Sequence, residues 1–403
     1  MPAVPPFFKH PSRYPNLSRE LPEPGAEERA HSEALIQSIR AEISQVNGSM
    51  DFRRFMELAL YAPGLGYYSA GKFKFGAVGD FITAPELSPL FGRCIARQCE
   101  QIMRPLGPCD ILEAGAGSGA LAVELLIELE ARACLPVNYF IIELGADLRE
   151  RQQEHIKRRA PHLFPRVQWL DTLPISGFRG VILGNELLDS MPVQRFCVGE
   201  DGITQLIIGW QDGKFVWREQ PADEAIVQRI TPLELPSGYA SEINFNAEAW
   251  VASIADMLEA GVLLLIDYGF PRLEFYHPER MQGTVMCHYR HHAHGDPLIL
   301  VGLQDITAHV DFTAVAEAGH QAGLEVAGYT SQADFLLATG LMEFIENSDP
   351  REARTHLHLS RQIKKLTLPS EMGELFKVIA MGRNLANEEQ LLGFTRRDRR
   401  GRL

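Results

Sequence analysis

A short apolar run that ends in an acid and precedes three closely spaced glycines constrains this chain more than any other feature. The run covers residues 109–113, and Gly115, Gly117 and Gly119 alternate with small residues before a helical pattern over 121–130. This order is typical of a buried strand, a tight turn and a helix, the first unit of a doubly wound α/β sheet. The glycines leave room for a ligand to approach the backbone, and the helix N-terminus offers unpaired N–H groups. The stretch therefore predicts a nucleotide-like ligand.

The identity of that ligand is narrowed by the residues around the turn. Gly115, Gly117 and Ala120 satisfy the loose dinucleotide pattern, so NAD or FAD stays open on the glycines alone. Glu113 favours S-adenosylmethionine (SAM), because a carboxylate there would repel a pyrophosphate but can hold a cationic amino-acid end. Gly119 opens the turn further, and the rest of the chain supplies no nicotinamide site. A glycine turn that binds no ligand is the structural alternative.

Two further strands end in acids that suit the same cofactor. Residues 139–143 form an apolar run about twenty residues beyond the glycines, and its final Glu143 is placed to accept hydrogen bonds from both ribose hydroxyls. Residues 167–170 form a short strand that ends at Asp171, which we expect near the exocyclic amine of adenine. A helix N-terminal role for Glu143 and a capped turn at Asp171 are the structural alternatives. The predicted contacts in this part are Glu143, Leu144, Asp171 and Thr172.

Three polar side chains follow the fourth strand, which ends at Gly184. They are Asn185, Glu186 and Asp189, and the two acids would share one face if the segment makes a helical turn. Because ligands bind outside the carboxyl ends of parallel strands, we expect this group to face the glycine turn. A helix cap is the structural alternative, but three such groups exceed what a cap requires.

Composition limits the class of protein. The chain has 403 residues and a net charge of −13, which argues against a broad nucleic-acid surface. No apolar run approaches the length of a membrane span, and the six cysteines contain no C-x-x-C pair, which suits a reducing compartment. The N-terminus lacks a secretory apolar segment and carries several glutamates, so we expect a cytoplasmic protein. The histidines of the 288–294 loop lack regular ligand spacing, and no metal is predicted.

The pattern along the chain predicts a leader, a helical lid segment and one large domain with insertions. A Pro-rich leader covers residues 1–30, and residues 31–108 form helices and an irregular segment rich in Gly, Pro and aromatic residues. This segment is either a lid over the ligand, in which Thr83 and Pro85 are predicted cofactor contacts, or an irregular N-terminal packing segment. The SAM domain covers 109–385. Two Asp-Gly turns indicate a β-hairpin insertion over 193–240, and helical patterns indicate a second insertion over 333–368. A late strand at 375–383 suits the antiparallel seventh strand of a methyltransferase sheet, and 386–403 is expected to be a solvated basic tail.

Six motifs together resemble the MidA family of SAM-dependent methyltransferases, over about residues 30–385. This resemblance implies a class I methyltransferase fold, Rossmann-like and doubly wound. Mitochondrial members of the family are associated with symmetric dimethylation of a protein arginine during respiratory complex I assembly, although membership alone does not name the acceptor. The motifs are residues 79–86, 113–119, 185–192, 267–269, 305–312 and 372–378.

The resemblance and the residues together predict a protein arginine methyltransferase. A guanidinium has a pKa of about 12 or more and therefore stays protonated at neutral pH. Carboxylates that hold it and accept its proton would assist methyl transfer. Glu186 and Asp189 are the candidates, with Asn185 orienting the methyl donor or the acceptor. We therefore expect a protein substrate, and a homodimer is left open. The alternatives are a SAM-binding assembly factor, a small-molecule methyltransferase and, more remotely, a nicotinamide oxidoreductase.

Overall fold

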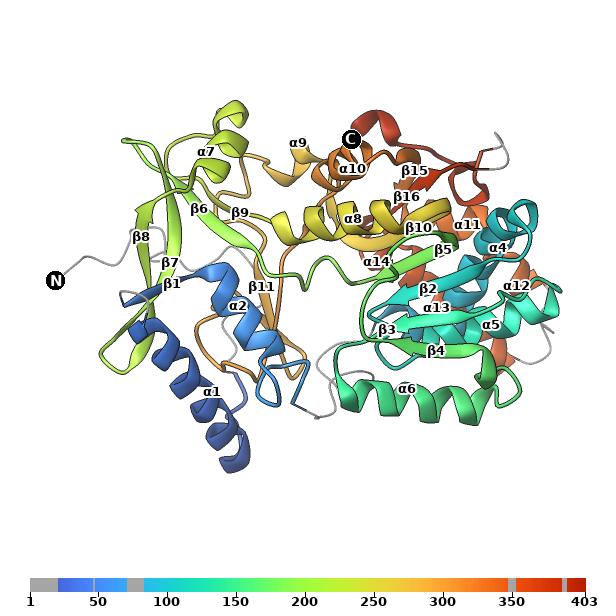
Figure 1. Cartoon of the computed structure of the whole chain (residues 1–403), viewed down its shortest axis with the longest axis horizontal. Coiled ribbons are helices and arrows are strands. Elements are labelled where there is room, and N and C mark those ends of the chain that lie inside the picture. Colours follow the sequence, from blue (N-terminus) through green and yellow to red (C-terminus); the bar gives the residue numbers. More distant parts are fainter. Residues whose placement is uncertain (1–20, 46–47, 71–82, 347–352, 386–389) are drawn as a thin grey trace. The chain divides into compact units, whose positions relative to one another are not determined.

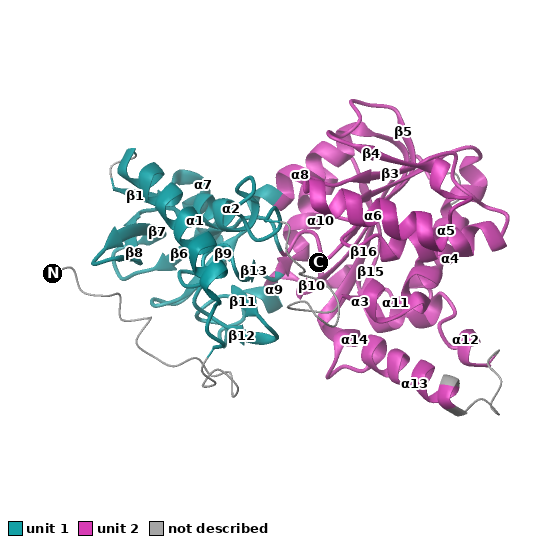
Figure 2. Ribbon diagram, turned by 90° about the horizontal axis from the view of Figure 1, so that it is seen from below, with its two compact units in different colours: residues 1–81, 190–246, 273–309 teal, residues 82–189, 247–272, 310–403 magenta. Residues whose placement is uncertain are grey.

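The structure is a computed structural model that describes residues 21–45, 48–70, 83–346, 353–385 and 390–403. The chain divides into two compact units (Figure 2), each built from three separate stretches of sequence. Unit 1 comprises residues 1–81, 190–246 and 273–309, and unit 2 comprises 82–189, 247–272 and 310–403.

A mostly parallel sheet forms the centre of unit 2 (Figure 1). Within the described residues it has eight strands in the order β15-β16-β10-β5-β2-β3-β4, with β14 paired to β10. The strands from β4 to β10 run parallel, whereas β16 is antiparallel to both of its neighbours. The strands are β2 (Asp110–Ala114), β3 (Tyr139–Ile142), β4 (Val167–Leu170), β5 (Phe178–Asn185), β10 (Leu258–Phe270), β14 (Val310–Asp311), β15 (Glu325–Ser331) and β16 (Phe376–Arg383).

The core of unit 2 lies between this sheet and its helices. Ile111, Ile141, Val181, Leu264 and Val378 come from five different strands and are fully buried in one cluster. Such near-continuous apolar strands are expected where a parallel sheet is covered on its faces. The helices are α3 (Ala84–Leu87), α4 (Pro89–Leu106), α5 (Ala120–Ala131), α6 (Ala146–Arg159), α8 (Phe245–Met257), α10 (Phe312–Gln321), α11 (Gln332–Ala338), α12 (Glu343–Glu346), α13 (Ala353–Thr367) and α14 (Met372–Leu375).

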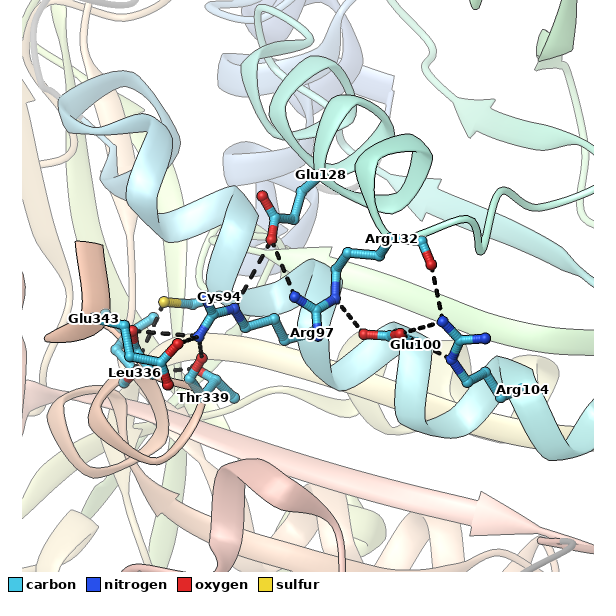
Figure 3. Close-up of polar contacts among 10 residues, drawn as sticks. Cys94, Arg97, Glu100, Arg104, Glu128, Arg132, Leu336, Thr339 and Glu343 are labelled. Atoms are coloured by element: carbon cyan, nitrogen blue, oxygen red, sulfur yellow. Dashed lines mark hydrogen bonds and ion pairs between the residues drawn. The ribbon is translucent and has the colours of Figure 1, made fainter. Parts of the chain in front are cut away.

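A group of paired charges joins α4 to α5 and to the end of α11 (Figure 3). Arg97 donates to the carbonyl oxygen of Thr339 at 3.1 Å and to a carboxylate oxygen of Glu343 at 2.9 Å. Glu100 accepts hydrogen bonds from Arg132 and Arg104. We call this group the helix charge network; its members are Arg97, Glu100, Arg104, Glu128, Arg132 and Glu343.

Unit 1 contains two antiparallel sheets within the described residues. One has the order β1-β7-β6-β9 with β8 paired to β7, and the other has the order β12-β11-β13. The β6–β7 and β7–β8 hairpins predicted from the Asp-Gly turns are confirmed, and Asp212 and Gly213 adopt φ values of 50° and 80° in the second turn. The elements are α1 (Ala26–Gln45), β1 (Ser49–Asp51), α2 (Phe52–Tyr61), β6 (Gln194–Val198), β7 (Ile203–Gln211), β8 (Lys214–Pro221), α7 (Glu224–Ile230), β9 (Ala240–Ile243), α9 (Arg272–Phe275), β11 (Met286–Tyr289), β12 (His292–His294) and β13 (Asp305–Thr307).

The division into units differs from the boundaries expected from the sequence. The hairpin insertion groups with the N-terminal helices, because β1 pairs antiparallel with β7 and both contribute to one apolar core. Residues 82–108, expected in the N-terminal segment, belong instead to unit 2. Helix α1 begins at Ala26, so helix already occupies the end of the expected leader. These pairings join segments more than a hundred residues apart in sequence, which local patterns do not reveal.

The expectation of a solvated C-terminal tail is wrong in part, because residues 390–403 include buried as well as exposed side chains. Phe394 is fully buried and contacts the ring of Phe335, with ring centroids 5.7 Å apart. Arg399 is also buried, and it donates to carboxylate oxygens of Asp334 at 2.9 Å and Glu374 at 3.1 Å. The basic run therefore includes a residue that is neutralised by acids from distant helices.

Candidate functional site

The glycine bend between β2 and α5 has the conformation that the sequence predicts. Gly115, Gly117 and Gly119 have φ values of 69°, 53° and 79°. A residue with a side chain would be strained there by roughly 1–2 kcal/mol, because Cβ approaches the following carbonyl oxygen. A Cβ added to Gly117 would meet no atom within 4 Å. The bend therefore combines glycine-only backbone with open space beside it.

Glu113 lies just before this bend and is 3% exposed. Its carboxylate accepts a hydrogen bond from the Tyr139 hydroxyl at 2.7 Å. Burial raises the pKa of Glu113 to about 7, although the Tyr139 hydrogen bond opposes this change. A cation placed next to this carboxylate would favour its charged form. Glu113 is thus suited to respond to a positively charged ligand group.

Glu143 directly follows β3 and is connected to the glycine bend. It accepts hydrogen bonds from the Gly145 backbone N–H at 2.9 Å and from Gln152 Nε2 at 3.2 Å. Gln152 also donates to the Gly117 carbonyl oxygen at 3.0 Å. Each oxygen of Glu143 retains capacity to accept a further hydrogen bond. The sequence analysis missed Gln152, since a single polar residue on α6 gives no local signal of such a contact.

The other predicted cofactor contacts after β3 and β4 lie at the carboxyl ends of these strands. Leu144 is 80% exposed, directly after Glu143. Asp171, predicted near the exocyclic amine of adenine, forms an ion pair with Arg149 at 2.8 Å, and Arg149 also donates to the Leu170 carbonyl oxygen. Thr172 is exposed next to Asp171. The roles of these residues toward the cofactor remain predictions.

The segment after β5 does not form the helical turn that would place Glu186 and Asp189 on one face. Glu186 adopts a left-handed conformation with a φ of 49°, and residues 186–191 form bends and a turn. A carboxylate oxygen of Asp267, on β10, accepts backbone N–H groups of Leu187 at 3.1 Å, Leu188 at 2.9 Å and Asp189 at 3.4 Å. The condition for the two acids to share a helical face is therefore not met, because a carboxylate about eighty residues away shapes this turn. The sequence analysis assigned no role to Asp267, although it is an acid near the end of a buried strand.

Negative charge and an unsatisfied acceptor are concentrated at this turn. Asp267 is 1% exposed and Asp189 is 5% exposed. Burial raises the pKa of Asp267 well above its ordinary value, and the charges of Asp189 and Glu186 raise it further. Asn185 donates to Glu186 at 3.3 Å, whereas its buried Oδ1 has no hydrogen-bond partner in the described part of the chain. The arrangement favours a ligand that is cationic and carries N–H donors.

The glycine bend lies next to the turn that carries Asn185, Glu186 and Asp189, which we call the acid turn. Strands β2 and β5 are parallel neighbours, with Ala114 paired to Gly184. A Cβ on Gly115 would lie 3.0 Å from a methyl carbon of Leu187. The structure thus brings together the two segments that the sequence analysis selected.

The predicted lid contacts are only partly described. Gly79 to Ile82 lie outside the described residues, whereas Thr83 precedes the short helix α3 and Pro85 lies within it. Glu86 of this helix accepts a hydrogen bond from the Ser118 hydroxyl in the glycine bend. Thr83 and Pro85 are therefore close in sequence to a residue that contacts the bend.

Comparison with known proteins identifies what this site resembles. Residues 91–330 match a family described as "putative S-adenosyl-L-methionine-dependent methyltransferase". A Burkholderia thailandensis protein crystallised with S-adenosyl-homocysteine (SAH) is 45% identical, with a TM-score of 0.92, over 95% of this chain and 100% of that chain. A native crystal structure from the same organism gives a TM-score of 0.90, again at 45% identity over 95% and 100% of the two chains. The predicted cofactor and the predicted class of enzyme are confirmed.

Further relatives have lower sequence identity, but their similarity covers most of the chain. A Drosophila melanogaster protein named a mitochondrial protein arginine methyltransferase, an NDUFAF7 homologue, is 25% identical over 90% of this chain and 88% of its own length. The Danio rerio NDUFAF7 is 27% identical over 85% of this chain and 86% of its own length. These names confirm the resemblance found in the sequence. They contradict the expected cytoplasmic location, because the relatives are named as mitochondrial. Across the described ranges, no helix combines the length and apolarity that crossing a bilayer requires.

Proposed function

The chain belongs to this S-adenosyl-L-methionine-dependent methyltransferase family, and on that premise we propose that it methylates an arginine side chain of a partner protein. The observation that carries the proposal is the acid turn, which Asp267 holds beside the glycine bend. The names of the curated relatives support the choice of arginine. The antiparallel β16 at its place in the sheet supports the finer assignment to the class I fold.

The residues around the glycine bend fit SAM. Gly117 leaves open space, and Glu143 has acceptor capacity for ribose hydroxyls. Glu113 would hold the cationic amino-acid end, and its raised pKa would fall as that cation approaches. Leu144, Asp171 and Thr172 would contact the adenine, and Thr83 and Pro85 would close the site from α3.

The acid turn would serve the methyl acceptor. When bound, SAM supplies an electrophilic methyl group on its sulfonium, and transfer depends mainly on the approach of the acceptor nitrogen. Glu186 and Asp189 hold the guanidinium, and one of them accepts the proton that leaves the methylated nitrogen. The unsatisfied Oδ1 of Asn185 accepts an N–H of the acceptor and orients it. Asp267 is a positioning residue, because it acts through the backbone of the turn.

A labelling experiment tests this proposal. The purified protein is incubated with radiolabelled SAM and an extract of cells that do not contain this protein. Labelled proteins are then mapped for methylarginine by mass spectrometry. We expect Glu186→Gln to lower methyl incorporation by roughly 10²- to 10³-fold, because the carboxylate that holds the acceptor and takes its proton is lost. SAH affinity should stay unchanged.

The matched control is Glu150→Gln, which removes an exposed acid from α6. It should leave both incorporation and SAH affinity at the wild-type level. Undiminished incorporation by the Glu186→Gln variant would contradict the role of this acid. Label found only on small molecules or on residues other than arginine would contradict the proposed acceptor.

A further inference from the structure

Helix α13 carries a net positive charge, opposite in sign to the net charge of the chain. The whole sequence contains 52 acidic and 39 basic residues, Asp and Glu against Lys and Arg, for a net charge of −13. The sequence of α13 contains no acidic residue, and its formal positive charges come from Arg354, Arg361, Lys364 and Lys365. A helix that serves only solubility usually mixes both signs. This uniform sign requires another explanation.

The exposed side chains of α13 form one stripe. At about 100° per residue, they fall on roughly a third of the helix circumference. Leu357 is 59% exposed and Leu368, just beyond the helix, is 43% exposed, and the basic residues surround them. We call this set the α13 stripe; its members are Arg354, Leu357, His358, Arg361, Lys364, Lys365 and Leu368.

The stripe is not used within the described chain. None of its basic side chains forms an ion pair or a side-chain hydrogen bond with another described residue. The opposite face of α13 is occupied, since Ile363 and Leu366 are buried in the core of unit 2 and Gln362 donates to the Leu87 carbonyl oxygen at 3.1 Å. The helix is therefore anchored on one face and presents cations and two leucines on the other.

We propose that the α13 stripe docks an acidic helical segment of a partner protein that carries leucine-like side chains. Complementary charge orients the partner segment and speeds its encounter with the stripe. Burial of the two leucines adds apolar contact. Their separation of eleven residues places them three helical turns apart on the same face, which suits a partner helix lying alongside. A bilayer is a poorer occupant, because an interfacial helix needs a broad apolar face and that face of α13 is already buried. The chain's overall negative charge disfavours nucleic acid.

Hydrogen bonds connect the α13 stripe to the proposed cofactor site, so docking at the stripe would affect that site. Gln362 also accepts a hydrogen bond from the Ser88 hydroxyl at 3.0 Å, so α13 contacts both ends of the Leu87–Ser88 link that follows α3. Glu86 of α3 contacts Ser118 in the glycine bend. The stripe is thus a docking surface connected to the bend, separate from the acids proposed to receive the methyl acceptor. The proposal does not depend on the identity of that acceptor.

A binding experiment with the full-length protein tests the proposal. The probe is a fluorescent synthetic helical peptide with two leucines eleven residues apart, flanked by glutamates. Its affinity is measured by fluorescence anisotropy, and it should weaken as salt is raised because exposed charges are screened. Arg361→Glu with Lys365→Glu should weaken binding at least tenfold, and Leu357→Ser with Leu368→Ser should weaken it several-fold.

Matched controls separate the stripe from net charge. Arg158→Glu with Arg397→Glu makes the same charge change at exposed positions elsewhere and should bind the peptide like the wild type. Ile175→Ser removes a 95% exposed apolar side chain outside the stripe and should also have no effect. Circular dichroism melts establish that every variant folds. The proposal would be overturned if the control charge variant weakened binding equally, or if the glutamate peptide showed no measurable binding. It would also be overturned if phosphatidylserine vesicles or RNA bound the stripe more tightly than the peptide does.

Discussion

Two regions of unit 2 use charge in opposite ways. In the helix charge network, Arg97 and Arg132 meet carboxylates within hydrogen-bond distance. Burial tends to raise the pKa of Glu100, but hydrogen bonds from Arg132 and Arg104 outweigh it and lower the value. At the ends of the parallel strands, Glu113, Glu143 and Asp267 are buried, and burial raises their pKa values. We call these three acids, together with Glu186 and Asp189 of the acid turn, the strand-end acids.

The contrast separates charge that stabilises the fold from charge that is kept for a ligand. A paired surface charge contributes little but costs little, whereas a buried carboxylate is costly unless something compensates it. Buried acids with raised pKa values concentrate at functional sites for this reason. The strand-end acids should therefore govern binding of SAM and its acceptor, and the helix charge network should govern stability alone.

The largest expected effect comes from closing the glycine bend. Gly117→Val should weaken SAH binding by 100-fold or more, because the side chain would occupy the open space and strain a φ of 53°. Isothermal titration calorimetry with SAH measures this. Gly107→Val is the matched control, since Gly107 has a φ of 73° and similar open space at the end of α4. Comparable affinity in both variants would show that the bend does not hold the cofactor.

The next effect concerns the charge of Glu113. Glu113→Gln should bind SAH about tenfold more weakly, because a charge-assisted hydrogen bond to the amino-acid end is lost. In the wild type, affinity for SAH should rise between pH 6 and pH 8, since the cation binds the ionised form of a group whose pKa is about 7. Calorimetry in buffers of different ionisation enthalpy should detect a released proton. An affinity independent of pH in this range would contradict the assignment.

Glu113 also affects stability in a pH-dependent way. Its folded pKa of about 7 lies above the ordinary value of 4.5, so its stabilising contribution is complete below pH 4.5 and is lost as pH rises through 7. Glu113→Gln should therefore match the wild type near pH 4 and be more stable by up to about 3 kcal/mol at pH 8. Urea unfolding at both pH values measures this difference. A less stable variant at pH 8 would reverse the sign and refute the argument.

A smaller effect is expected for the residue that shapes the acid turn. Asp267→Ala removes the acceptor of four backbone N–H groups, three in the acid turn and that of Tyr268, and should lower the free energy of unfolding by roughly 1–3 kcal/mol. Asp267→Asn should cost less than about 1 kcal/mol, because one oxygen remains and repulsion from Asp189 and Glu186 is relieved. Urea unfolding compares the two. If both variants were equally unstable, charge rather than acceptor geometry would hold the turn.

The smallest effect tests the helix charge network. Arg97→Ala should lower the free energy of unfolding by about 1–2 kcal/mol, because this largely buried arginine satisfies the carbonyl groups after α11. Arg104→Ala, at a side chain 55% exposed, should cost only a few tenths of a kcal/mol. SAH affinity, measured by calorimetry, should be unchanged in both. A loss of SAH affinity would contradict the claim that the helix charge network governs stability alone.

The sequence predicted the features that are encoded locally. Two features follow from short-range patterns, and the structure confirms them: the strand–glycine–helix order at Gly115 to Gly119 and the hairpin turn at Asp212. The path of the chain after Glu186 could not be predicted, because its determinant, Asp267, lies far along the sequence. Burial of Phe394 depends likewise on distant partners.

The position of β16 has a consequence for synthesis of the protein. This strand lies between β10 and β15 but is made last, at residues 376–383. Until the ribosome delivers it, one edge of the long apolar strand β10 has no neighbour there to satisfy its backbone groups. A nascent or C-terminally truncated chain would expose a template for self-association. Quality control of this protein should therefore depend strongly on whether β16 reaches the sheet.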